Sequence, residues 1–103
     1  MIVVSAMYPT VNGSRFDFDY YMHKHVPLVG KLCKDLGLRE IQIFRGLASL
    51  DGGGPAFHVT ALLTFGSMEE FQNAMSKHGA EIIADIANFT DSQPALQLNE
   101  PLA

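Results

Sequence analysis

One histidine stands out because it falls inside the apolar stripe of a predicted helix. Residues 16–36 have apolar side chains at helical spacing. At about 100° of rotation per residue, the side chains within roughly 60° of His25 are apolar or aromatic: Phe18, Tyr21, Met22, Leu28, Val29, Leu32 and Leu36. An imidazole can take or give one proton near neutral pH. His25 is therefore a candidate acid/base residue in an apolar pocket.

Tyr21 precedes His25 by four residues and lies on the same stripe. A phenol one helical turn from an imidazole can share a ligand oxygen with it. Each residue also has a structural explanation: His25 as a core histidine bonded to a backbone carbonyl, and Tyr21 as a packing residue. Both explanations stay open, and Tyr20 is predicted to point away from the pocket.

The other histidines and the cysteine give weaker candidates. His78 lies on the apolar stripe of a second predicted helix and could be a second acid/base or an axial haem ligand. The chain has no Trp, and a histidine at a helix C-terminus is favoured by the dipole, so we predict no haem or other cofactor. His23 faces solvent, so it cannot share a metal with His25, and no metal site is predicted. Cys33 lacks an evident activating environment. We expect phenylalanines to supply the pocket walls: Phe16, Phe57, Phe65 and Phe89.

The elements that position these residues follow from periodicity and turn residues. Residues 2–8 form a β-rich run stopped by Pro9, and an Asn12-Gly13 pair marks a turn. The helix from residue 16 contains Pro27, which should distort the backbone beside His25. Residues 38–47 and 57–65 alternate around a glycine-rich loop and predict an antiparallel hairpin. That loop lacks the following helix and the Lys-Ser/Thr pair of a phosphate-binding loop.

A second helix and a last strand complete the pattern. Ser67-Met-Glu-Glu70 is a capping box, Gly79 punctuates the helix that it opens, and residues 80–87 add further helical turns. Residues 95–99 form a short strand bracketed by Pro94 and Pro101. The order β, α, β, β, α, β predicts an α+β, ferredoxin-like domain with a four-stranded antiparallel sheet and both helices on one face.

Size and composition predict one globular domain over residues 1–103, with 48% hydrophobic and 17% charged residues. The sheet face without helices would expose Phe44 and Leu62, and stacking two such faces predicts a homodimer. A net charge of −4 with only seven scattered Lys and Arg argues against nucleic acid. One cysteine favours a reducing compartment, and so a cytoplasmic location. The N-terminal apolar run is too short for a signal or membrane segment.

Two blocks of sequence resemble the EthD family, named for an ethyl tert-butyl ether degradation protein. They are residues 16–29, with Tyr-Tyr-Met-His-Lys-His-Val-Pro-Leu-Val, and residues 84–91, Ala-Asp-Ile-Ala-Asn-Phe-Thr-Asp. The resemblance implies a dimeric α/β barrel. Relatives in that wider superfamily include lactone isomerases, polyketide cyclases, cofactor-free monooxygenases and haem enzymes, so the fold does not settle the chemistry. His25 matches the histidine of the family's Lys-His-x-Pro-Leu motif within the first block. Asp85 and Asn88 match the second block, where turn and capping roles account for both.

These inferences give a leading hypothesis. The chain is a cytoplasmic homodimer with one apolar pocket per subunit, between helices and sheet. There His25 with Tyr21 moves a proton on a small aromatic, lactone or polyketide-like compound without a cofactor, as an isomerase, cyclase or oxygenase-like enzyme. Four residues are assigned to ligand binding: Phe16, Phe65, His78 and Phe89. The alternatives are a non-catalytic ligand-binding or accessory protein of a degradation pathway, and a structural dimer without a pocket.

Overall fold

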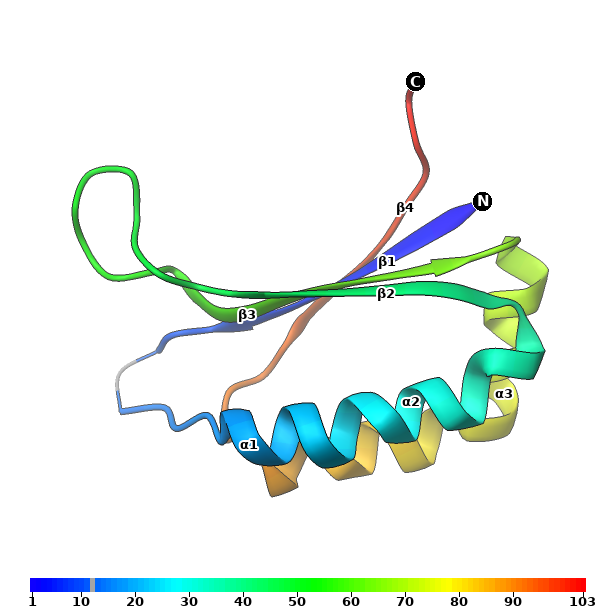
Figure 1. Ribbon diagram of the computed structural model, residues 1–103, viewed down its shortest axis with the longest axis horizontal. Helices are drawn as coiled ribbons and strands as arrows, with labels where there is room; N and C mark the ends of the chain where they lie inside the picture. The colour runs from blue at the N-terminus through cyan, green and yellow to red at the C-terminus, as the bar shows by residue number, and fades with distance from the viewer. Residues whose placement is uncertain (12) are drawn as a thin grey trace.

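The computed structural model describes residues 1–11 and 13–103 and shows one sheet with helices packed on one of its faces (Figure 1). The strands are β1 (Ile2–Pro9), β2 (Leu38–Arg45), β3 (Phe57–Phe65) and β4 (Ala95–Asn99). All neighbouring strands are antiparallel, in the order β2-β3-β1-β4. This is the ferredoxin-like α+β fold that the sequence predicts. Asn12, the first residue of the predicted Asn-Gly turn, lies outside the described residues, and Gly13 has a positive φ of 72°.

The first helical segment is built from four short pieces in one continuous run. They are α1 (Phe18–Tyr20), the π-helical turn η1 (Tyr21–His25), α2 (Val26–Cys33) and the 3₁₀ turn η2 (Lys34–Leu36). Asp17 caps the start, where its side chain accepts from the backbone N–H of Tyr20 at 3.0 Å. In the π-helical turn, the N–H of Val26 donates to the carbonyl of Tyr21, five residues earlier.

This π-helical turn is the distortion expected beside His25. Pro27 lies in the first turn of α2, and its missing N–H is compatible with a local change of hydrogen-bond pattern. The turn also changes which side chains face inward. Tyr21 and His25 are only 2% and 5% exposed, whereas Met22 is 45% exposed. The prediction that Met22 belongs to the buried stripe is therefore wrong, because it assumed the regular α-helical 100° per residue throughout.

The second helix, α3 (Met68–Asp85), is followed by the 3₁₀ turn η3 (Ile86–Asn88). Ser67 caps its start, and its hydroxyl accepts from the N–H of Glu70 at 3.1 Å. The helix runs without a break through Gly79, which is buried within it, so the predicted interruption at this residue is wrong. A single glycine inside a helix costs only about 1 kcal/mol relative to alanine, and the packing of α3 on the sheet outweighs that cost.

The core lies between helices and sheet in two clusters. One gathers aromatic residues around Tyr8, Tyr21 and Phe89, and the other gathers Val29, Cys33 and Phe65 with their neighbours. On the opposite face of the sheet, no helix packs among the described residues (Figure 1), and Phe44 is 51% exposed there. Among the described residues, no helix combines the length and apolar character needed to cross a bilayer.

Candidate functional site

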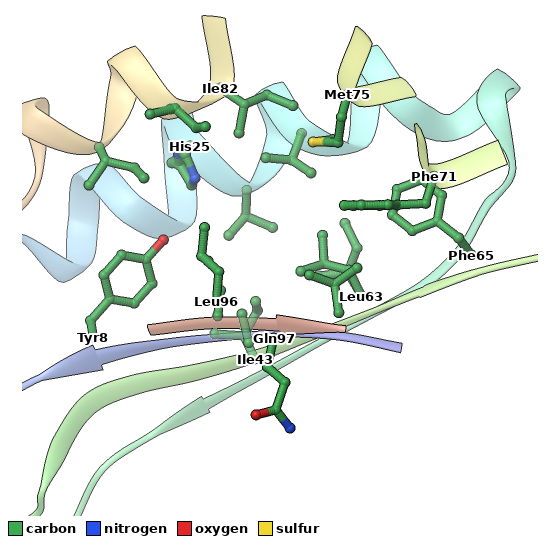
Figure 2. Close-up of a pocket in the computed structure, with 18 of the residues that line it drawn as sticks. Tyr8, His25, Ile43, Leu63, Phe65, Phe71, Met75, Ile82, Leu96 and Gln97 are labelled. Carbon is green, nitrogen blue, oxygen red and sulfur yellow. The ribbon is translucent and has the colours of Figure 1, made fainter. Parts of the chain in front are cut away.

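A cavity of about 260 Å³ lies between the helices and the sheet (Figure 2). Its walls are almost wholly aliphatic and aromatic. The lining residues are Val4, Ala6, Tyr8, Tyr21, His25, Val26, Val29, Ile41, Ile43, Ala61, Leu63, Phe65, Phe71, Met75, Ile82, Ile83, Ile86, Leu96, Gln97 and Leu98. The Gln97 amide points away from the cavity in Figure 2 and donates to Asn99 Oδ1 at 2.6 Å. Tyr8, Tyr21 and His25 are therefore the lining residues that can present nitrogen or oxygen atoms of their side chains to a ligand.

His25 reaches this cavity from the end of the π-helical turn. Its ring lies 4.7 Å from the ring of Phe89 and 5.6 Å from the ring of Tyr21, measured between centroids. Its Nδ1 atom lies 2.9 Å from Oδ2 of Asp85, the last residue of α3. The imidazole is thus packed against two aromatic rings and bonded at one nitrogen by a carboxylate.

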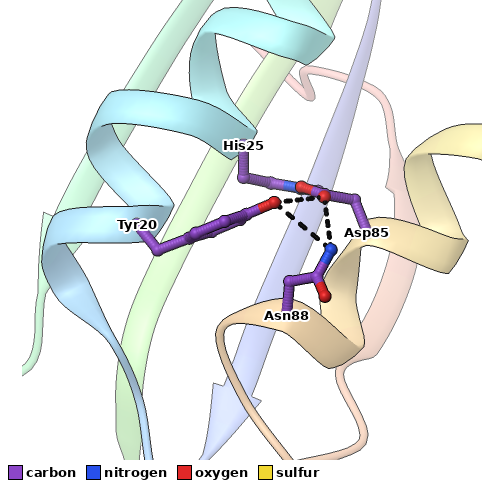
Figure 3. A network of polar contacts seen from close by, with 4 residues as sticks. All are labelled: Tyr20, His25, Asp85 and Asn88. Carbon is purple, nitrogen blue, oxygen red and sulfur yellow. Dashed lines mark hydrogen bonds and ion pairs between the residues drawn. The ribbon is translucent and has the colours of Figure 1, made fainter.

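Asp85 is held in turn by two further side chains (Figure 3). Its Oδ1 accepts a hydrogen bond from the Tyr20 hydroxyl at 2.6 Å and another from Asn88 Nδ2 at 3.0 Å. Asn88 Nδ2 also donates to the Tyr20 hydroxyl oxygen at 3.2 Å. Tyr20 from α1 and Asn88 from η3 therefore both bond Oδ1 of Asp85, which leaves Oδ2 for His25.

These contacts determine which nitrogen of His25 carries the proton. An ionised carboxylate only accepts hydrogen bonds, so Nδ1 of His25 must be the donor to Asp85. In the neutral ring, Nε2 then carries a lone pair. Within residues 1–11 and 13–103, no side chain or backbone group forms a hydrogen bond with Nε2, and the residue lines the cavity. The free lone pair is available to a ligand.

The pKa values of the pair favour this arrangement. Burial lowers the pKa of His25 below its usual value, and the hydrogen bond and charge of Asp85 oppose that shift without reversing it. For Asp85, burial alone would raise the pKa, but the hydrogen bonds from Tyr20, Asn88 and His25 outweigh it and hold the pKa below its usual value. At neutral pH the pair is a carboxylate beside a neutral imidazole, which is the state of a proton acceptor.

The structure brings together some of the residues predicted from the sequence and separates others. Tyr21 and Phe65 line the cavity with His25. Phe16 and Phe89 pack behind it, with ring centroids 5.3 Å apart, and are not lining residues. His78 is half-buried on α3 and does not line the cavity. In the part of the chain that the structure describes, no three His, Cys, Asp or Glu side chains are placed to hold a metal ion.

The sequence interpretation missed the partners of His25. It gave Asp85 and Asn88 turn and capping roles and predicted that Tyr20 points away from the pocket. Tyr20 is indeed outside the cavity, but its hydroxyl bonds Asp85. One signal was present in the sequence: Asp85 falls in the last turn of a helix predicted to reach residue 87, and no Lys, Arg or His accompanies it in that turn. A carboxylate at the negative end of a helix is unfavourable unless other groups bond it.

The comparisons with known proteins give the family of the chain. The EthD domain matches residues 14–93. The chain belongs to the EthD family. Among solved structures, an EthD-like protein from Ralstonia eutropha JMP134 is 41% identical, with a TM-score of 0.90 over 99% of this chain and 92% of that one.

More distant structures extend the likeness. An ethyl tert-butyl ether degradation (EthD) family protein from Bacillus halodurans C-125 is 25% identical, with a TM-score of 0.79 and 99% of both chains covered. A protein described as an antibiotic biosynthesis monooxygenase is 12% identical, with a TM-score of 0.53 and 100% of both chains covered, and shares the fold alone. A comparison with curated proteins finds no match. The EthD relatives therefore support the family and the architecture, and the chemistry has to be argued from the cavity.

Proposed function

We propose that this EthD protein is a cofactor-independent enzyme that moves a proton on a small apolar molecule, with His25 as the acid/base. The observation that carries the proposal is the asymmetry of the His25 ring. Asp85 bonds Nδ1 at 2.9 Å, and Nε2 is left to the cavity. A histidine that served packing alone would gain nothing from two side chains that orient its carboxylate partner, since each polar group removed from water adds a desolvation cost.

The cavity walls support an apolar substrate. Among the residues that the structure describes, no Lys or Arg lines the cavity, so these walls offer a phosphate or free carboxylate no fixed positive charge. A volume of about 260 Å³ lies just below the range of roughly 300–1,000 Å³ that is typical of pockets for drug-sized ligands, which suits a small molecule. Aromatic, lactone or polyketide-like compounds fit these conditions, because they combine apolar rings with one or two oxygens.

The reaction step follows from the protonation state of the pair. Neutral His25 accepts a proton at Nε2 from an acidic C–H or O–H of the substrate, and the imidazolium that forms donates from Nδ1 to the Asp85 carboxylate. The carboxylate stabilises that cation while remaining ionised. Return of the proton to a different atom would complete an isomerisation or promote a cyclisation. Tyr21, on the same wall, stays a candidate for a second polar contact with the substrate.

The proposal also covers the oligomeric state and the cellular location of the protein. We infer a homodimer formed through the sheet face that carries no helix, because Phe44 is half-exposed there and an apolar face of this kind is commonly covered by a partner. The free thiol of Cys33 is fully buried and suits a reducing compartment. The cytoplasmic location stays a prediction.

The test is deuterium exchange on an apolar ketone that has acidic C–H groups. In D₂O, ¹H NMR of 2-tetralone follows the loss of its C1 protons with and without the protein. We expect catalysed exchange, and a reduction of about 10²-fold or more in His25→Gln. His23→Gln is the matched control: His23 is exposed and bonds the backbone carbonyl of Asp19 at 2.9 Å, so its exchange rate should equal that of the native protein.

The same measurement separates the alternative function. A non-catalytic binding protein would bind 2-tetralone, as seen by line broadening of its NMR signals, and leave the exchange rate at the background value. Equal exchange by His25→Gln and native protein would also remove the acid/base role of His25. Circular dichroism of the variants shows that any loss of exchange does not come from unfolding.

A further inference from the structure

Tyr8 is a second polar group of the cavity that the proposed reaction has not used. It lies on β1, which with β3 forms the two central strands of the sheet. Its side chain is on the face of the sheet that the helices cover. The residue is 3% exposed and lines the same cavity as His25. In Figure 2 its hydroxyl is at the inner end of the ring and points into the cavity, on the side where His25 enters.

The Tyr8 hydroxyl is open to a ligand. Among the described residues it forms no hydrogen bond with another group, and no fully enclosed side-chain polar atom lacks a partner. The unbonded oxygen therefore faces cavity space rather than packed protein. Buried polar groups in proteins are nearly always hydrogen-bonded, so a hydroxyl kept free at an apolar cavity wall is suited to donate to a bound molecule.

The Tyr8 ring packs against aromatic rings that also contact the His25 ring. Its centroid lies 5.4 Å from that of Phe16, 5.9 Å from Tyr21 and 5.5 Å from Phe89, all edge to face. Tyr21 and Phe89 are also the two rings that contact His25. The phenol and the imidazole thus share two packing partners and line the same cavity.

We propose that Tyr8 is a catalytic hydrogen-bond donor that binds the carbonyl oxygen of the substrate while His25 moves a proton at the adjacent carbon. This inference rests on the proposed function and narrows its substrate class to apolar ketones and lactones with an acidic C–H beside the carbonyl. Polarisation of the substrate carbonyl by Tyr8 does not require a metal ion. An O–H donor that points at the developing oxyanion in a water-free cavity strongly stabilises the negative charge.

The step balances within the substrate and the two side chains. Nε2 of His25 takes the proton from the carbon next to the carbonyl, and the electron pair of the broken C–H bond forms the C=C bond of an enolate. The carbonyl π electrons move to the oxygen, which accepts the Tyr8 O–H···O⁻ hydrogen bond. The imidazolium, still bonded to Asp85, then returns a proton to a carbon of the enolate, and the C=O bond reforms.

The ionisation of Tyr8 agrees with this role. Burial raises the pKa of Tyr8 to about 12, so the phenol keeps its proton throughout the neutral range and acts as a donor. Burial also raises the pKa of Tyr21, whose ring is stacked on His25 at an interplanar angle of 21°. Tyr21 is therefore the natural residue for comparison, because it is a second buried phenol that lines the same cavity.

The experiment compares Tyr8→Phe with Tyr21→Phe in two measurements. The first is exchange of 2-tetralone in D₂O, where we expect Tyr8→Phe to lower the rate by about 10²-fold, as loss of one oxyanion donor does, without moving the pH midpoint set by His25. The second is binding of 2-naphthol, whose hydroxyl takes the place of the enol oxygen. We expect Tyr8→Phe to weaken this binding about tenfold and Tyr21→Phe to lower both quantities less than Tyr8→Phe does. His23→Gln, at an exposed residue that does not line the cavity, should leave both quantities at their native values.

A labelled native protein keeps the proposal testable if Tyr8→Phe folds poorly. Incorporation of 3-fluorotyrosine gives ¹⁹F signals for Tyr8, Tyr20 and Tyr21, the three tyrosines of the chain, which single substitutions assign. Addition of 2-naphthol should shift the Tyr8 signal most, and a Tyr8 signal that does not move at saturation overturns its role.

The outcomes separate this inference from the function on which it rests. Exchange that is lost in His25→Gln and retained within twofold in folded Tyr8→Phe overturns the role of Tyr8 and leaves the proposed function intact. A loss confined to Tyr21→Phe assigns the donor to Tyr21 and likewise overturns Tyr8. A native protein that binds 2-tetralone without catalysing exchange overturns both.

Discussion

The contact between His25 and Asp85 decides what the cavity can do chemically. The carboxylate holds the proton on Nδ1 of His25 at a distance of 2.9 Å, so the nitrogen that faces the cavity is the basic one. Tyr20 and Asn88 fix the carboxylate from the other side. They are positioning residues, because they act on the substrate only through Asp85 and His25.

Replacing Asp85 by Asn should remove most of the activity while the cavity keeps its shape. The Asn amide can donate to Nδ1, which would place the ring proton on Nε2 and leave no lone pair toward the substrate. We expect 2-tetralone exchange to fall by about 10²-fold or more. Asp19→Asn is the control, since Asp19 is exposed in the first turn of α1, and it should exchange at the native rate.

The pH dependence of the same reaction tests the ionisation of His25. The neutral ring is the active form, so the rate should fall as the pH drops through the pKa of His25, which burial holds below its ordinary value of 6.5. Without the Asp85 charge, the pKa in Asp85→Asn should be lower still. NMR titration of the imidazole measures both values. A native midpoint above 6.5, or an Asp85→Asn midpoint above the native one, would contradict this account.

At the scale of the elements, the π-helical turn places Tyr21 and His25 side by side on the inner wall. It covers Tyr21–His25 and is followed at once by α2, whose first turn contains Pro27. Single π-helical turns within α-helices are frequent at functional sites. Here the turn points Met22 toward solvent, whereas Tyr21 and His25 remain on the buried face.

Alanine substitutions at Met22 and Val29 should therefore differ sharply in stability. Met22 is 45% exposed, so Met22→Ala should change the free energy of unfolding by no more than about 0.5 kcal/mol. Val29 is 6% exposed in the core against Phe65 and Cys33, so Val29→Ala should cost about 1–3 kcal/mol. Urea unfolding measures both. A Met22→Ala cost above about 2 kcal/mol would mean that the regular helical stripe is correct and the π-helical turn is not.

The same turn shows what sequence reasoning could and could not supply. Alternation in residues 57–65 predicted β3 with its correct bounds, and the capping box at Ser67 placed the start of α3, because both patterns are local. Pro27 indicated a distortion beside His25, but its type could not be read from a constant 100° per residue. Asp85 was missed because it meets His25 from 60 positions further along the chain, and its own neighbours gave it an adequate local role.

At the scale of the whole molecule, the two faces of the sheet have different surroundings. The cavity face carries Ala61, Leu63 and Val4 under the helices. The other face presents residues that alternate with these in register. One cross-strand row contains Phe44, Thr60, Met7 and Ala95, and the next contains Gln42, Leu62, Ser5 and Gln97. A mostly apolar row beside a mostly polar one can pair with its own copy about a two-fold axis.

The homodimer through this face should therefore be sensitive to a charge at Phe44. Sedimentation at micromolar concentration should show a dimer for the native protein. Phe44→Glu should weaken association by about 10²-fold or more, because the interface would bury an unpaired carboxylate. Leu50→Glu is the matched control, since Leu50 is fully exposed in the loop between β2 and β3, and this variant should sediment as the native protein does.

Two outcomes would contradict this interface. A native monomer at micromolar concentration would contradict the dimer itself. A Phe44→Glu dimer of native strength would mean that a different face forms the contact, such as the edge of β4 with its half-exposed Leu96 and Leu98.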